Sequence, residues 1–120
     1  MHIKRFFGRS QKNYNILFPR TMSVDGKLEY PDGSFVFYKQ RTVKEALKPG
    51  IIFCSGYNSS LNGNKPTFLD NYCEKRNISY LRFDYIGHEN SSGTIHDALL
   101  STWKQNFLDV IDKLTSGNNY

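Results

Sequence analysis

Residues 49–56 read Pro-Gly-Ile-Ile-Phe-Cys-Ser-Gly, an uninterrupted apolar run between two turn-forming pairs. The pairs limit the run to Ile51–Cys54, which is too short for a helix and suits a strand. A strand that is apolar at every position is typical of a parallel sheet, because helices cover both of its faces. We therefore expect Ile51–Cys54 to be a buried strand of an α/β protein.

The residues that follow this strand predict a βαβ unit. A polar loop at 55–64 leads into residues 66–76, where apolar side chains recur on one face of a helix. Residues 78–83 are a second strand, and a second polar loop at 84–93 comes next. Apolar residues at helical spacing over 101–115 predict another helix. A strand, a helix and a strand at this spacing form a right-handed crossover with parallel strands.

The residues before this strand predict a β-hairpin. Residues 27–30 and 34–39 are rich in strand-forming types, and Pro31-Asp32-Gly33 between them is a strong turn signal. The expected fold class is therefore α/β, with an antiparallel hairpin, a βαβ unit and a further helix.

The positive charge of the chain is concentrated at its N-terminus. The formal net charge is +5, and residues 1–24 hold five of the 16 Lys and Arg residues but none of the 11 Asp and Glu residues. The rest of the chain is therefore neutral, which argues against a nucleic-acid partner, because nucleic-acid modules carry positive charge on their folded surface. A basic, acid-free segment with interspersed Phe and Leu is typical of a mitochondrial transit peptide, and the alternative is a terminus without a targeting role.

These observations divide the chain into a basic leader over 1–24 and one folded domain over 25–120. No apolar run approaches the roughly 20 residues that a membrane-spanning helix needs, so we expect no membrane span. The two cysteines, Cys54 and Cys73, have apolar neighbours and are expected to be buried free thiols. No metal-ligand spacing and no glycine-rich phosphate motif is present, so we expect neither a metal nor a cofactor.

Ligands of α/β folds bind at the carboxyl ends of parallel strands, which here means the loops at 55–64 and 84–93. The second loop contains acidic, histidine and serine residues, but catalytic triads are assembled from separate elements. We expect Asp84 to cap local backbone N–H groups, and His88 and His96 to be exposed. A self-sufficient small hydrolase that uses Ser92 with one of these histidines is a less favoured alternative.

Several motifs, in the same order, resemble the N-terminal half of the α/β-hydrolases. The subgroup that they resemble is the mitochondrial palmitoyl-protein thioesterases and acyl-glucuronide esterases. The motifs are Pro49–Phe53, Ser55-Gly56-Tyr57, Asn62-Gly63, Leu81–Tyr85 with Gly87, Ser91–Gly93, Trp103-Lys104 and Val110–Asp112. The resemblance covers roughly residues 49–117 and implies an α/β-hydrolase sheet that is incomplete in this chain.

The resemblance also implies site residues. In these hydrolases a serine attacks an ester or thioester carbonyl, and two backbone N–H groups hold the resulting oxyanion. Transferred to this sequence, one of those donors is the N–H of Tyr57, with Gly56 and Asn58 beside the substrate. The nucleophile, the acid and the histidine would all lie beyond Tyr120, and the 120 residues contain no Gly-x-Ser-x-Gly elbow.

The resemblance therefore predicts an N-terminal fragment of a serine hydrolase that is inactive alone. Its complete relatives act on acyl esters or thioesters, depalmitoylation included. The alternative is a non-catalytic module that binds an acyl ligand or pairs with a full-length hydrolase through an exposed sheet edge. The expected location is the mitochondrial matrix, with the cytoplasm as the alternative.

Overall fold

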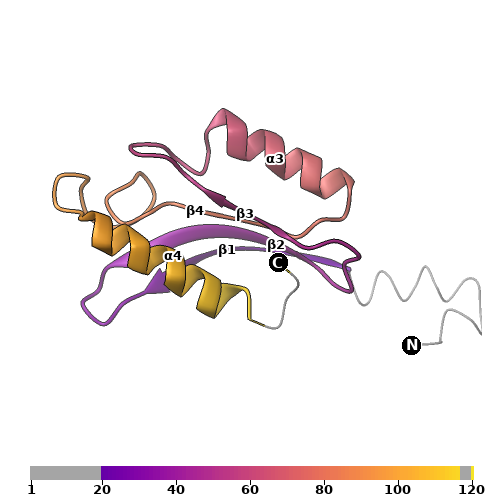
Figure 1. Cartoon of the computed structure of the whole chain (residues 1–120), viewed down its shortest axis with the longest axis horizontal. Helices are drawn as coiled ribbons and strands as arrows, with labels where there is room; N and C mark the ends of the chain where they lie inside the picture. Colours follow the sequence, from indigo (N-terminus) through magenta and orange to yellow (C-terminus); the bar gives the residue numbers. More distant parts are fainter. Residues whose placement is uncertain (1–19, 117–119) are drawn as a thin grey trace, which may run out of the picture.

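The computed structural model describes residues 20–116 and residue 120, and in them a four-stranded sheet is flanked by two helices (Figure 1). The strand order is β1-β2-β4-β3. In chain order the elements are β1 (Thr21–Glu29), β2 (Phe35–Val43), β3 (Ile51–Cys54), α3 (Asn64–Lys75), β4 (Tyr80–Phe83) and α4 (Leu100–Leu114). The expected architecture of a hairpin, a βαβ unit and a further helix is confirmed.

The β1–β2 hairpin is longer than the sequence predicted. Its turn lies at the expected Pro-Asp-Gly segment, where the Tyr30 N–H donates to the Ser34 carbonyl at 2.8 Å. Antiparallel pairing then continues to Thr21, the first residue of β1. Residues 21–25 are all exposed, although Met22 and Val24 alternate with polar residues as in a strand. This part of the hairpin therefore carries a strand signal that the predicted bounds left out. β1 begins four residues before the expected domain boundary, and residues 1–19 of the expected leader lie outside the described residues.

The βαβ unit has the predicted geometry. β3 and β4 are parallel, with Ile51 opposite Tyr80, and α3 connects them. β4 also pairs with β2, in antiparallel fashion, so β4 lies inside the sheet. Within the described residues the outer edge of β3 has no neighbouring strand.

Each helix covers one face of the sheet. On the α4 face the buried side chains are Val36, Leu81, Phe83 and Val110. On the α3 face they are Cys73, Ile78 and Tyr80. Because side chains alternate along β4, this one strand supplies both cores, and all four of its residues are buried. Within the described residues, no helix is both long enough and apolar enough to cross a membrane.

The two cysteines differ from each other. Cys73, a residue of α3, is buried between this helix and the sheet, as expected. Cys54 is exposed, so the expectation of a buried thiol is wrong at this position. The reason is its place at the end of β3, the end strand among those described.

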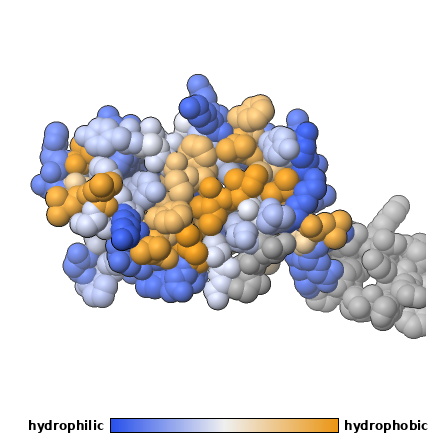
Figure 2. Space-filling view, in the orientation of Figure 1, coloured by the Kyte–Doolittle hydropathy of each residue, from blue (hydrophilic) through white to orange (hydrophobic). Residues whose placement is uncertain are grey.

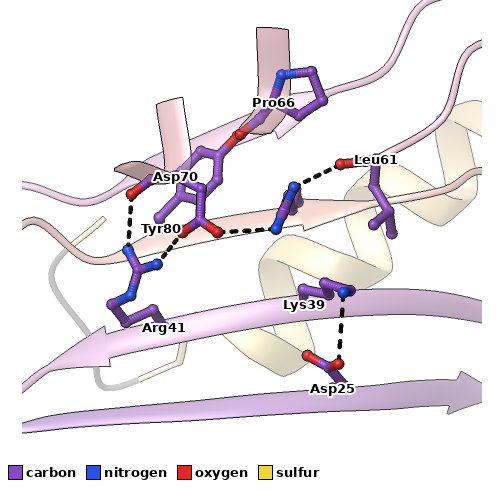
Figure 3. Close-up of polar contacts among 8 residues, drawn as sticks. Asp25, Lys39, Arg41, Leu61, Pro66, Asp70 and Tyr80 are labelled. Carbon is purple, nitrogen blue, oxygen red and sulfur yellow. Dashed lines mark hydrogen bonds and ion pairs between the residues drawn. The ribbon is translucent and has the colours of Figure 1, made fainter. Parts of the chain in front are cut away.

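An ion-pair cluster fastens α3 to the sheet (Figure 3). The Asp70 carboxylate on α3 accepts hydrogen bonds from Arg41 of β2 and, at 2.9 Å, from Arg82 of β4. The guanidinium of Arg82 also donates to the Leu61 carbonyl at 2.8 Å. The Tyr80 hydroxyl donates to the Pro66 carbonyl at 2.9 Å, so the first turn of α3 is attached as well. These contacts fix α3 and the loop before it relative to β2 and β4.

Candidate functional site

The loop after β3 forms a tight turn over Gly56–Ser59. The Ser59 N–H donates to the Gly56 carbonyl at 3.1 Å and closes the turn. Asn58 adopts φ of 55°, a left-handed conformation that Asn tolerates better than most residues. Within the part of the chain that the structure describes, the Tyr57 N–H donates no hydrogen bond. The backbone donor singled out by the resemblance is therefore unpaired.

His88, in the loop after β4, holds this turn in place. Its Nε2 atom accepts a hydrogen bond from the Asn58 N–H at 2.9 Å. The imidazole is 5% exposed, so the expectation of an exposed His88 is wrong, whereas His96 is exposed as expected. The burial follows from a turn in which the His88 N–H donates to the Tyr85 carbonyl at 2.9 Å. That turn directs the ring toward the β3 loop instead of toward solvent.

Gly87 allows the chain to make this turn. Its φ is +89°, a conformation that side chains rarely adopt. A Cβ atom at this position would also lie 2.8 Å from the Thr94 carbonyl oxygen. The close backbone approach between residues 87 and 94 therefore requires glycine.

Three aromatic rings surround the imidazole. Trp103 of α4 lies closest, with ring centroids 5.2 Å apart, followed by Tyr85 at 6.1 Å and Tyr57 at 6.4 Å. Trp103 is itself held by its Nε1–H, which donates to the Ile86 carbonyl at 2.9 Å. Burial raises the pKa of Tyr85 to about 12, so its hydroxyl is neutral at physiological pH.

Asp84 has the structural role that the sequence predicted. Its carboxylate is fully buried and accepts from the Leu61 N–H at 2.7 Å and from the Asn90 N–H at 3.1 Å. It thereby joins the β3 loop to the β4 loop. Asp84 is a capping residue of these two loops, and the prediction is confirmed.

The serines of the β4 loop are bound to the sheet. Ser92 Oγ accepts from the Phe35 N–H at 2.8 Å, and Ser91 Oγ accepts from the Phe37 N–H at 2.8 Å. These bonds extend the attachment of β2 beyond its pairing with β4. No hydrogen bond joins Ser92 to His88 or His96 within residues 20–116. The geometry gives the alternative of a self-sufficient Ser92 hydrolase no support.

A pocket of about 410 Å³ opens between the β3 loop, the β4 loop and α4. Its lining is mainly aromatic and apolar, with Lys104 as a cationic contributor. The lining residues are Ser55, Gly56, Tyr57, Tyr85, His88, Leu100, Trp103, Lys104 and Phe107. In Figure 2, hydrophobic residues form a band across the middle of the view, in the area that β3 occupies in Figure 1. Tyr57, whose N–H is unpaired among the described residues, is therefore one of the residues that line this largely apolar pocket.

The site contains two residues that sequence reasoning missed. Trp103 belongs to the apolar pattern that predicts the helix over 101–115, and the sequence predicts an exposed His88. His88 carries a positional signal, because it lies in the loop at the carboxyl end of β4, where ligands bind, whereas Trp103 lies in the first turn of α4. Among the described residues, no group of three or more His, Cys, Asp or Glu side chains is arranged to hold a metal ion.

Comparison with known proteins places the chain beside hydrolases. No protein-family model matches it. It is 37% identical over 90 residues to the bovine mitochondrial palmitoyl-protein thioesterase ABHD10. This alignment covers 75% of the chain and 28% of the bovine protein. The structure of mouse α/β hydrolase domain-containing protein 10 superposes with a TM-score of 0.67 and 28% identity, over 76% of this chain and 35% of that one.

A second solved structure, a putative hydrolase from Agrobacterium vitis S4, superposes with a TM-score of 0.66 and 26% identity, over 79% of this chain and 36% of that one. The chain therefore spans less than a third of the bovine relative and slightly more than a third of each solved structure. The matched portion is smaller than the half that the sequence motifs indicated.

Proposed function

The chain is a member of the α/β-hydrolase superfamily, and from this premise we propose that it forms the oxyanion loop of a serine ester or thioester hydrolase. The observation that carries the proposal is the unpaired Tyr57 N–H beside the apolar pocket. A backbone donor fixed before the reaction begins stabilises the negative charge that develops on a carbonyl oxygen in the transition state. Gly56 and Asn58, which flank this donor in the turn, are proposed to contact the substrate.

The proposed substrates are acyl esters and acyl thioesters. The bovine relative is named as a palmitoyl-protein thioesterase, and the apolar lining of the pocket suits an acyl chain. These 120 residues contain no Gly-x-Ser-x-Gly elbow, and Ser91 and Ser92 are hydrogen-bonded to β2. We therefore propose that the 120-residue chain does not turn over such substrates alone.

A chimera tests this proposal. The bovine relative would have its matched segment replaced by the corresponding segment of this chain, and hydrolysis of a palmitoyl thioester would be measured. Tyr57→Pro removes the donor N–H, and Pro suits this position of a turn. Tyr57→Ala is the matched control, because it removes the ring and keeps the N–H.

We expect the chimera to be active and Tyr57→Pro to lower kcat by about 10²–10³-fold, the usual effect of losing one oxyanion donor. Tyr57→Ala should retain most of kcat. Equal losses in the two variants would contradict the assignment of the N–H, and a folded but inactive chimera would contradict the proposed function.

The proposed location is the mitochondrial matrix. The curated relatives are named as mitochondrial, and residues 1–24 are basic and free of acidic side chains. Fusion of residues 1–24 to a fluorescent protein should direct it to mitochondria. A diffuse cytoplasmic signal would contradict this proposal and favour the cytoplasmic alternative.

One observation favours a second candidate function, the binding of an acyl ligand without catalysis. The pocket has an apolar wall that includes Trp103, the single tryptophan of the chain. If the chain binds acyl ligands, palmitate should change the fluorescence of Trp103 in a saturable manner.

The other non-catalytic alternative is pairing with a full-length hydrolase through the outer edge of β3. It predicts that the chain co-purifies with that hydrolase, and that blocking this edge abolishes the co-purification.

A further inference from the structure

We infer that His88 is the positioning residue of the oxyanion loop, because its neutral imidazole holds the Asn58 N–H and thereby the turn that presents the Tyr57 N–H. The inference rests on the proposed function for its catalytic meaning. The hydrogen bond from Asn58 to His88, and the protonation state of the imidazole that this bond requires, can be tested on the 120-residue chain without an assay of catalysis.

The contact joins two loops that are far apart in the sequence. Asn58 follows β3 and His88 follows β4, and the Asn58 N–H to Nε2 distance is 2.9 Å. Asn58 is the residue of the turn with positive φ, so its conformation is the least favourable one in that turn. A hydrogen bond at this residue therefore acts where the turn most needs support.

The direction of the bond specifies the state of the imidazole. A backbone N–H can only donate, so Nε2 must be the acceptor and carry no proton. In the neutral ring the proton then resides on Nδ1, which is buried and has no hydrogen-bond partner among the described residues. A doubly protonated imidazole has two donors and no acceptor, so it would oppose the Asn58 N–H.

The ionisable groups near His88 belong to the two loops, to the end of β3 and to α4. The Tyr85 hydroxyl is neutral at physiological pH, because burial raises its pKa to about 12. Tyr57 and Lys104 line the same pocket, and Cys54 lies against Tyr85. The Asp84 carboxylate is occupied by Leu61 and Asn90.

Protonation of His88 is therefore expected to release the turn that carries Tyr57. The consequence for the proposed hydrolase is that a doubly protonated His88 no longer supports the oxyanion donor. A residue that only filled space would not produce this dependence on the protonation state of the ring.

The test is an NMR titration of the 120-residue chain. Long-range proton–nitrogen spectra report which imidazole nitrogen of His88 carries the proton. Hydrogen exchange reports the protection of the Asn58 amide, and the fluorescence of Trp103 reports the charge on the adjacent ring. The amide of Leu61, which donates to Asp84, serves as the internal control.

Two variants separate the hydrogen bond from packing. His88→Phe keeps a ring of similar size and removes the acceptor, whereas His88→Gln places a carbonyl oxygen near the position of Nε2 and does not titrate. His96→Gln is the matched control at an exposed histidine. If His88→Phe does not fold, His88→Gln alone still distinguishes the outcomes, because it should keep the Asn58 protection and lose its pH dependence.

We expect neutral His88 to be protonated on Nδ1 and the Asn58 protection factor to fall about tenfold in His88→Phe, as expected for one net hydrogen bond. In the unmodified chain, Asn58 protection and Trp103 fluorescence should change with one common midpoint, while Leu61 is unaffected. A proton on Nε2, unchanged Asn58 protection in His88→Phe, or equal changes at Leu61 would overturn the inference. An inactive chimera combined with the expected NMR results would instead refute only the proposed function.

Discussion

Replacement of Asp70 by Asn is expected to lower the free energy of unfolding by about 3 kcal/mol. Asp70 accepts from two guanidinium groups, and the side chains of Arg41 and Arg82 are only 12% and 9% exposed. Removing one partner of a buried ion pair costs about 3–5 kcal/mol, because the other charge remains buried. The carboxylate is 25% exposed and Asn keeps one acceptor, so the lower end of that range applies.

The matched control is Asp25→Asn, because Asp25 forms the other ion pair drawn in Figure 3. Its carboxylate is 61% exposed and lies 3.7 Å from the Lys39 ammonium. Exposed pairs of this kind contribute about 0.2–1 kcal/mol and are screened by salt.

Urea unfolding followed by far-UV circular dichroism measures both variants, with equal m-values as the condition for comparing them. The difference between Asp70→Asn and the unmodified chain should persist at about 1 M NaCl, where an exposed pair is screened. If Asp70→Asn costs no more than Asp25→Asn, α3 is not held on the sheet by a buried charge cluster.

Three further predictions concern single positions. Gly87→Ala should lower the free energy of unfolding in urea by about 2 kcal/mol or more, because its φ is positive and its Cβ would meet the Thr94 carbonyl oxygen. Gly33→Ala should cost only about 1 kcal/mol, because Gly33 has the same φ of 89° but nothing lies within 4 Å of its Cβ. The pKa of Tyr85 in the folded chain is about 12, above its ordinary value of 10.0. The free energy of unfolding should therefore fall as pH rises from 10 to 12, and it should fall less in a Tyr85→Phe variant. Under native conditions a thiol reagent should modify Cys54 and spare Cys73, and both should react in denaturant; modification of both in the native chain would contradict the burial of Cys73.

The parts of the fold that could be predicted are those with a local signal. Ile51–Cys54 is apolar at every position, and this pattern is enough to indicate a parallel strand covered by helices. The turn at residues 31–33 also follows from local chemistry. The antiparallel pairing of β2 with β4 has no such signal, because it joins residues about 40 positions apart and depends on how the two units pack.

The candidate site shows the same division. The resemblance identifies Tyr57 by its place in a motif, and Asp84 is recognisable as a capping residue from its type and position. The burial of His88 is not predictable in this way, because it depends on the meeting of two loops and on the ring of Trp103. A histidine in a polar loop looks exposed in the sequence until its three-dimensional neighbours are known.

We propose that these 120 residues supply an oxyanion loop and no nucleophile. Hydrolysis of a p-nitrophenyl ester and a palmitoyl thioester by the purified 120-residue chain, with Ser92→Ala measured in parallel, decides between this proposal and a self-sufficient hydrolase. We predict no turnover above buffer for either protein. Saturable turnover by the unmodified chain that disappears in Ser92→Ala would contradict the claim.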